Sequence, residues 1–249
     1  MIVTVCELPD DRKAFENGWA QLAEHVRQAH SGLVLLPDMA FSSWFADSAA
    51  IDCARWRQAL ADHDAWEHRL GELGAALVLG SRPIDFGNER YDEGFVWTAD
   101  TGIRSVHAQA SHDFVPLEVD GVDIGFMIGS EVTARGERPY VRGAVDLVAM
   151  PRCTRGETFA QQLAQACSVA TESGAFALSS NRSAPFEGQG WIVAPDGCVL
   201  GTTSRAQPFV SLEIALPSER ASADPSRASP APDWMDPLDT GVPSYDLRS

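Results

Sequence analysis

Short apolar runs, each closed by a turn-forming residue, constrain the fold of this chain more than any other feature. Leu33–Leu36 runs unbroken into Pro37, and Ala75–Leu79 ends at Gly80. Runs of this length are typical of strands that are buried on both faces of a sheet. The alternating residues Met1–Cys6 form a further expected strand, so the chain begins with a strand, a helix and a second strand.

Helical stretches separate the expected strands. Apolar side chains recur at helical spacing over residues 14–30, with Gly32 as the expected C-cap, and again over residues 53–73 and 157–173. A chain of 249 residues with 45% hydrophobic composition suits one α/β domain. We expect that domain at residues 1–216, followed by a Pro-, Ser- and Asp-rich tail at residues 217–249.

Charge and cysteine usage exclude several classes of function. The formal net charge of −16 repels phosphate backbones and anionic lipids, so we expect neither nucleic-acid nor membrane partners. The five cysteines are scattered without metal-ligand spacing, which favours a reduced, cytoplasmic compartment. We expect no metal and no other cofactor.

Four sequence motifs lie one after another along the chain. They are Gly32–Met39, which contains Leu-Pro-Asp; Tyr91–Gly102, a strand and tight turn; Ile124–Glu131; and Asp146–Ser183, which contains Asn181-Arg182. Together they resemble the nitrilase (carbon–nitrogen hydrolase) superfamily over residues 1–216. The resemblance implies an α-β-β-α sandwich of two mixed sheets between helix layers, and a homodimer. It also implies hydrolysis of non-peptide C–N bonds by a glutamate, a lysine and a cysteine.

The positions of that triad are substituted here. The resemblance places Asp38 at the glutamate position and Gly129 at the cysteine position. The lysine position falls on Ala110, or on Ser105 in an alternative register, and the only lysine of the chain, Lys13, precedes the first expected helix. Since the reaction needs a thiolate nucleophile and a cation for the oxyanion, glycine and alanine remove both groups.

Other side chains near these phrases are candidates for a pocket. Trp44 is a candidate wall, His107 and His112 are candidate acids, bases or cations, and Cys153 is a candidate repositioned thiol. Ser130 and Glu131 follow the substituted cysteine position.

Two functions remain open from the sequence. The first is a catalytically inactive homologue that acts as a binding or regulatory protein for a small-molecule ligand. The alternative is a hydrolase that acts on a small amide, nitrile or carbamoyl compound through a non-standard set of residues.

Overall fold

The computed structural model describes residues 1–45, 52–87, 89–109, 113–132, 139–154, 159–183, 185–186 and 189–216. The side chain of Ser130 is also outside this description, as is the expected tail at residues 217–249.

The first sheet carries the N-terminal half of the described chain, and its strand order is β5-β4-β3-β2-β1-β12. β1, β2 and β3 run parallel, whereas β4, β5 and β12 are antiparallel to their neighbours. The bounds are β1 (Ile2–Leu8), β2 (Leu33–Leu35), β3 (Leu77–Phe86), β4 (Glu89–Thr98), β5 (Gly102–Ala108) and β12 (Phe209–Glu213).

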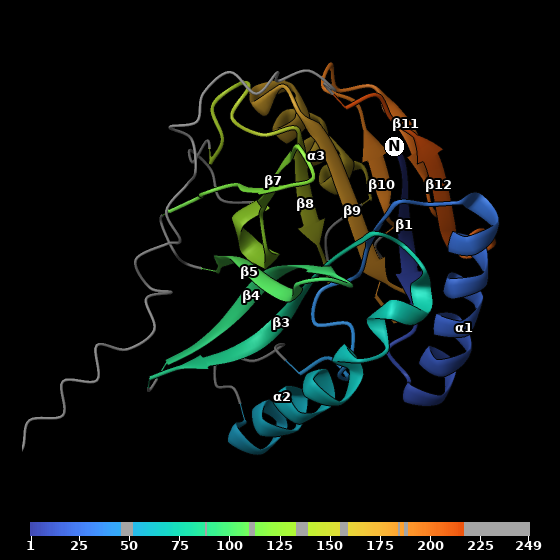
Figure 1. The fold of residues 1–249 in the computed structure, drawn as a ribbon, viewed down its shortest axis with the longest axis vertical. Coiled ribbons are helices and arrows are strands. Elements are labelled where there is room, and N and C mark those ends of the chain that lie inside the picture. The colour runs from blue at the N-terminus through green and yellow to red at the C-terminus, as the bar shows by residue number, and fades with distance from the viewer. Residues whose placement is uncertain are drawn as a thin grey trace, which may run out of the picture. The chain divides into compact units, whose positions relative to one another are not determined.

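The second sheet has the order β6-β7-β8-β9-β10-β11, with β7, β8 and β9 parallel. The bounds are β6 (Leu117–Val119), β7 (Val122–Phe126), β8 (Leu147–Pro151), β9 (Phe176–Arg182), β10 (Trp191–Val193) and β11 (Val199–Thr202). The two sheets meet where β1 and β9 lie side by side and pair over Glu7–Asn181 and Leu8–Arg182 (Figure 1). This junction brings residue 182 next to the first sheet.

Helices cover the outer faces of the sheets. α1 (Arg12–Ala29), α2 (Cys53–Glu67) and a 3-10 turn at Leu70–Leu73 lie on the side of the first sheet, and α3 (Phe159–Ser173) lies on the side of the second (Figure 1). A separate apolar core fills the space between the sheets. The predicted α-β-β-α sandwich is therefore confirmed. Among the described residues, no helix is long and apolar enough to cross a membrane.

The end of the first helix differs from the prediction. His30 is the C-cap, with a left-handed φ of 52°, and its N–H bonds to the carbonyl of Arg27. Gly32 instead joins the sheet, donating to Ile2 O at 2.9 Å and accepting from Leu77 N at 3.0 Å. The prediction for Gly32 was wrong because histidine can occupy the left-handed region that usually favours glycine.

The sheets approach each other closely at Gly94 on β4. A Cβ added there would lie 2.5 Å from the ring of Phe126, which is fully buried on β7. We therefore expect Gly94→Ala to lower the free energy of unfolding by about 1–3 kcal/mol through overpacking. Urea denaturation measures the loss, and Gly71→Ala, whose Cβ would meet only ordinary contacts, serves as the control. Equal midpoints for both variants would contradict this account of the inter-sheet contact.

Candidate functional site

Asp38 lies in the loop that leaves β2, and it is only 2% exposed. Ser81, on the neighbouring β3, donates its hydroxyl to Asp38 Oδ1 at 2.6 Å. The same hydroxyl accepts the backbone N–H of Met39 at 2.9 Å. Met39 has a left-handed φ of 42°, a conformation that non-glycine residues adopt only when their surroundings enforce it. Ser81 therefore holds both the carboxyl group and the strained turn that follows it.

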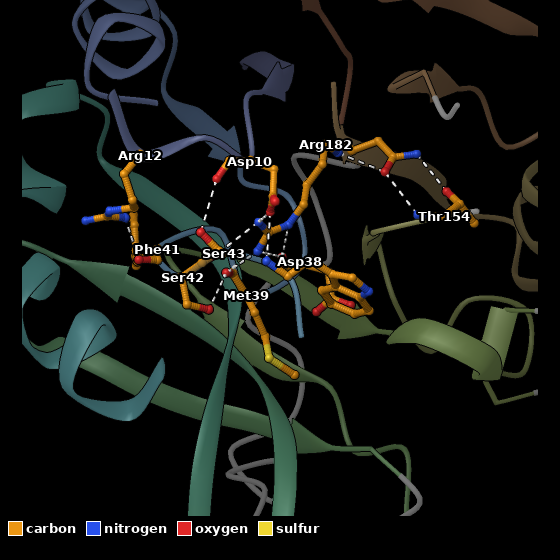
Figure 2. A network of polar contacts seen from close by, with 11 residues as sticks. Asp10, Arg12, Asp38, Met39, Phe41, Ser42, Ser43, Thr154 and Arg182 are labelled. Atoms are coloured by element: carbon orange, nitrogen blue, oxygen red, sulfur yellow. Dashed lines mark hydrogen bonds and ion pairs between the residues drawn. The ribbon is translucent and has the colours of Figure 1, made fainter. Parts of the chain in front are cut away.

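Arg182 also binds this loop (Figure 2). Its guanidinium donates to the carbonyl of Asp38 at 3.0 and 3.2 Å, to the carbonyl of Ser42 at 2.8 Å, and to the carbonyl of Met39. The same group forms an ion pair with Asp10. Because Arg182 is only 1% exposed and its planar fork reaches several acceptors at once, it satisfies loop carbonyls that would otherwise be buried without partners.

Asp92, on β4, is a second buried carboxyl group in contact with Asp38. It is 5% exposed, and its side chain is in hydrogen-bonding contact with Asp38. Burial raises the pKa of Asp38, and burial together with the charge of Asp38 raises the pKa of Asp92 well above its ordinary value. Two carboxyl groups in contact cannot both ionise at low cost, so the pair keeps a shared proton to a higher pH than an isolated aspartate would.

Gly129 begins a short 3-10 turn, Gly129–Val132, and it has a left-handed φ of 54°. A Cβ added at this position would lie 2.7 Å from Nε2 of Gln109, which donates to Ile128 O at 3.4 Å. The backbone N–H of Gln109 also bonds to Asp92 O at 2.7 Å. Gln109 thus links Asp92 to the turn and occupies the space beside Gly129 into which a side chain would project.

His107 and Glu131 form a pair at the same turn. His107 Nε2 lies 2.8 Å from Glu131 Oε1, and Glu131 Oε2 accepts the N–H of Ile128 at 2.7 Å. The His107 ring is 1% exposed and stacks on Phe114 with ring centroids 4.5 Å apart. Glu131 therefore closes the turn that begins at Gly129, and His107 supports it.

The remaining candidates are placed less centrally. The half-buried Trp44 lies beside the guanidinium of Arg182, whose Cζ is 5.7 Å from the ring. The half-buried Cys153 follows Arg152, whose carbonyl accepts the N–H of Asp38 at 3.2 Å. Ser105 lies within β5, paired with Phe95.

Ala110 and His112 lie outside the described residues, and so does the side chain of Ser130. The register of the lysine position therefore stays a prediction. In the described part of the chain, Gln109 lies directly after β5 and its side chain reaches Gly129. It is one position before Ala110.

Sequence reasoning missed Asp92, Ser81 and Gln109 as members of the site. The sequence did contain a signal for Asp92. The segment that begins at Tyr91 resembles the Tyr-Asn-x-Ala motif of the nitrilase superfamily, and Asp92 has a carboxyl group where the asparagine of that motif has an amide. Ser81 and Gln109 gave no signal, since their roles follow from strand pairing and from the course of the chain after β5.

Comparison with solved structures shows which proteins share this fold. An amidase from Nesterenkonia sp. matches with a TM-score of 0.70 at 16% identity, over 86% of this chain and 90% of that chain. A CN-hydrolase superfamily protein from Xanthomonas campestris matches with a TM-score of 0.65 at 14% identity, over 86% of this chain and 90% of that chain. No protein-family model and no curated protein matches the sequence. The fold is thus that of nitrilase-superfamily amidases.

The buried guanidinium of Arg182 gives a stability prediction. We expect Arg182→Met to lower the free energy of unfolding by about 3–5 kcal/mol, because Asp10 and the loop carbonyls lose their donor. The control is Arg69→Met, which removes the more exposed ion pairs of Arg69 with Glu16 and Glu72 and is expected to cost about 0–1 kcal/mol from the lost pairs. Urea denaturation compares the two variants, and similar losses would contradict a central role for Arg182.

The shared proton gives a pH prediction. Because the native carboxyl pair keeps a proton that the unfolded chain releases, the wild-type protein loses stability as pH rises above the ordinary carboxyl pKa of about 4, up to the raised native pKa. Asp92→Asn imitates the protonated acid, so we expect the variant to gain on the wild type over this window by up to about 1.4 kcal/mol per pH unit.

Denaturation at a series of pH values measures this difference. Asp100→Asn, which changes an exposed carboxyl on the β4–β5 turn, is the control and should follow the wild type. A constant difference between Asp92→Asn and the wild type across the window would mean that the two aspartates share no proton.

Proposed function

We propose that this protein is a nitrilase-fold homologue that binds a small molecule and does not carry out cysteine-dependent hydrolysis. The observation that carries the proposal is the state of position 129. Glycine supplies no nucleophile there, its φ of 54° disfavours any side chain, and Gln109 Nε2 lies 2.7 Å from where a Cβ would be.

The structural neighbours make the contrast concrete. The amidase from Nesterenkonia sp. AN1 has an active-site cysteine to which acrylamide adds, and a variant of it was solved in complex with butyramide. In this chain the sequence resemblance puts Gly129 at the nucleophile position. No lysine is available for the oxyanion, because Lys13 is exposed at the start of α1. The proposed function therefore retains the binding of a small molecule but not the formation of a covalent intermediate at a cysteine.

A second candidate function rests on the Asp38–Asp92 pair. Two carboxyl groups that share one proton are the arrangement with which aspartic proteases activate water, one accepting a proton while the other donates. Under this alternative the chain hydrolyses a small amide, nitrile or carbamoyl compound without a covalent intermediate. Both aspartates are buried, at 2% and 5% exposure, and the release of ammonia distinguishes the two candidate functions.

Ammonia release tests the proposal. The protein, at high concentration, is incubated with small amides, nitriles and carbamoyl compounds, including butyramide and propionamide, in parallel with Asp38→Ala and Asp92→Asn variants. We expect no release above the protein-free rate from any of the three. Release by the wild type that is lost in both variants would contradict the proposal and support the carboxyl-pair hydrolase.

A further inference from the structure

Three acidic side chains converge at the candidate site, with Asp92 between the other two. Asp92 is hydrogen-bonded to Asp38 on one side, and the charge of Glu131 also acts on it. Asp92 Oδ1 is buried and receives no hydrogen bond from an N–H or O–H group of the described residues. A buried carboxylate oxygen needs a partner, and a proton held between the carboxyl groups or a donor beyond the described residues can supply it.

A second buried atom in this region also lacks a partner. His107 is 1% exposed, its Nε2 contacts Glu131, and its Nδ1 has no hydrogen bond within the described residues. Buried polar atoms without partners are costly and uncommon in folded proteins. Two of them, on side chains that both interact with Glu131, indicate a place that a polar ligand completes.

The cations of the described residues around this place already have partners. The Arg182 guanidinium is engaged by the carbonyls of Asp38, Met39 and Ser42 and by Asp10. Arg82 donates to Glu93 Oε2 at 2.8 Å. Arg182 acts on Asp38 by its charge, but it donates its hydrogen bonds to these other groups and not to the carboxyl pair.

We propose that the Asp38–Asp92 pair binds a small organic cation through an ammonium group, which donates to Asp92 Oδ1 and releases the shared proton to solvent. This inference rests on the proposed binding function and names its ligand class. The ammonium stays protonated, so one proton leaves for each cation bound and the charges balance. A neutral amide would satisfy Oδ1 without supplying the charge, so it binds more weakly at this place.

An organic cation fits the described residues better than a metal ion. No group of three or more His, Cys, Asp or Glu side chains among them is placed to hold a metal. A monovalent ammonium needs fewer ligands, and its N–H groups match acceptors such as Asp92 Oδ1. Gln109, which donates its backbone N–H to Asp92 O, is itself half-buried.

Isothermal titration calorimetry with ethylammonium chloride tests the inference on the full chain. Propionamide is the neutral probe of similar size, and Asp92→Asn is compared with the exposed control Asp100→Asn. We expect saturable binding of ethylammonium to the wild type and to Asp100→Asn, with affinity at least about tenfold lower in Asp92→Asn. The isosteric amide keeps a hydrogen bond to Asp38 but removes a charge.

Proton release distinguishes this site from binding elsewhere on the acidic surface. The heat of binding, measured in two buffers of different ionisation enthalpy, should report release of up to about one proton in the wild type and none in Asp92→Asn. The charged groups that act on Asp92 in the described residues are Asp38 and Glu131, and these interact in turn with Arg182 and His107. Because these groups remain in Asp92→Asn, loss of proton release in that variant assigns the proton to the pair.

Each outcome separates the inference from the proposed function. Absent binding of ethylammonium, or equal affinity in the wild type and Asp92→Asn, overturns the inference. Binding of propionamide alone also overturns it, while the proposed binding function stands. Release of ammonia from propionamide overturns the proposed function instead. A denaturation curve of Asp92→Asn, recorded first, establishes that the variant is folded.

Discussion

The geometry of the candidate site depends on one buried side chain, Arg182. β9 pairs with β1 over only two residues, and the second of these is Arg182 itself. From there the guanidinium reaches the loop after β2 and satisfies its carbonyls, while Asp10 balances its charge (Figure 2). Without this donor the loop would need water or a different conformation, and Asp38 would lose its fixed position next to Ser81. The same residue, Arg182, thus lies at the junction between the two sheets and positions the loop that carries the carboxyl group of Asp38.

Much of the fold was predictable because burial imposes a regular spacing on apolar residues. The strand at Leu33–Leu36 and the stripe of α1 follow from that spacing alone, and the order of the motifs added the two-sheet architecture. Details that depend on single backbone angles were not predictable. His30, and not Gly32, ends the first helix, and the expected helix over residues 53–73 stops at Glu67 before a 3-10 turn.

The sequence predicted a site residue only where the family resemblance assigns a position to it. Asp38 and Gly129 follow from phrases in the sequence, whereas the contact of Asp38 with Asp92 arises from the packing of three adjacent strands. Ser81 opposes Gly94 in the β3–β4 pairing, and Asp92 opposes Pro83, so neither partner of Asp38 is near it in sequence. Gln109 reaches Gly129 only because the chain leaves β5 toward the second sheet. No local pattern encodes such contacts.

Under the proposed function, the lack of a lysine changes the chemistry more deeply than the lack of a cysteine. In the arrangement that the resemblance implies, a lysine ammonium stabilises the developing oxyanion. Here burial and the contact between Asp38 and Asp92 raise the pKa of both carboxyl groups, which favours a shared proton in place of a cation. A thiol restored at position 129 would still face a site without positive charge for the oxyanion. Under the proposed function, the carboxyl pair keeps the architecture of the site without the covalent reaction, and it is the place where we propose that an external cation binds.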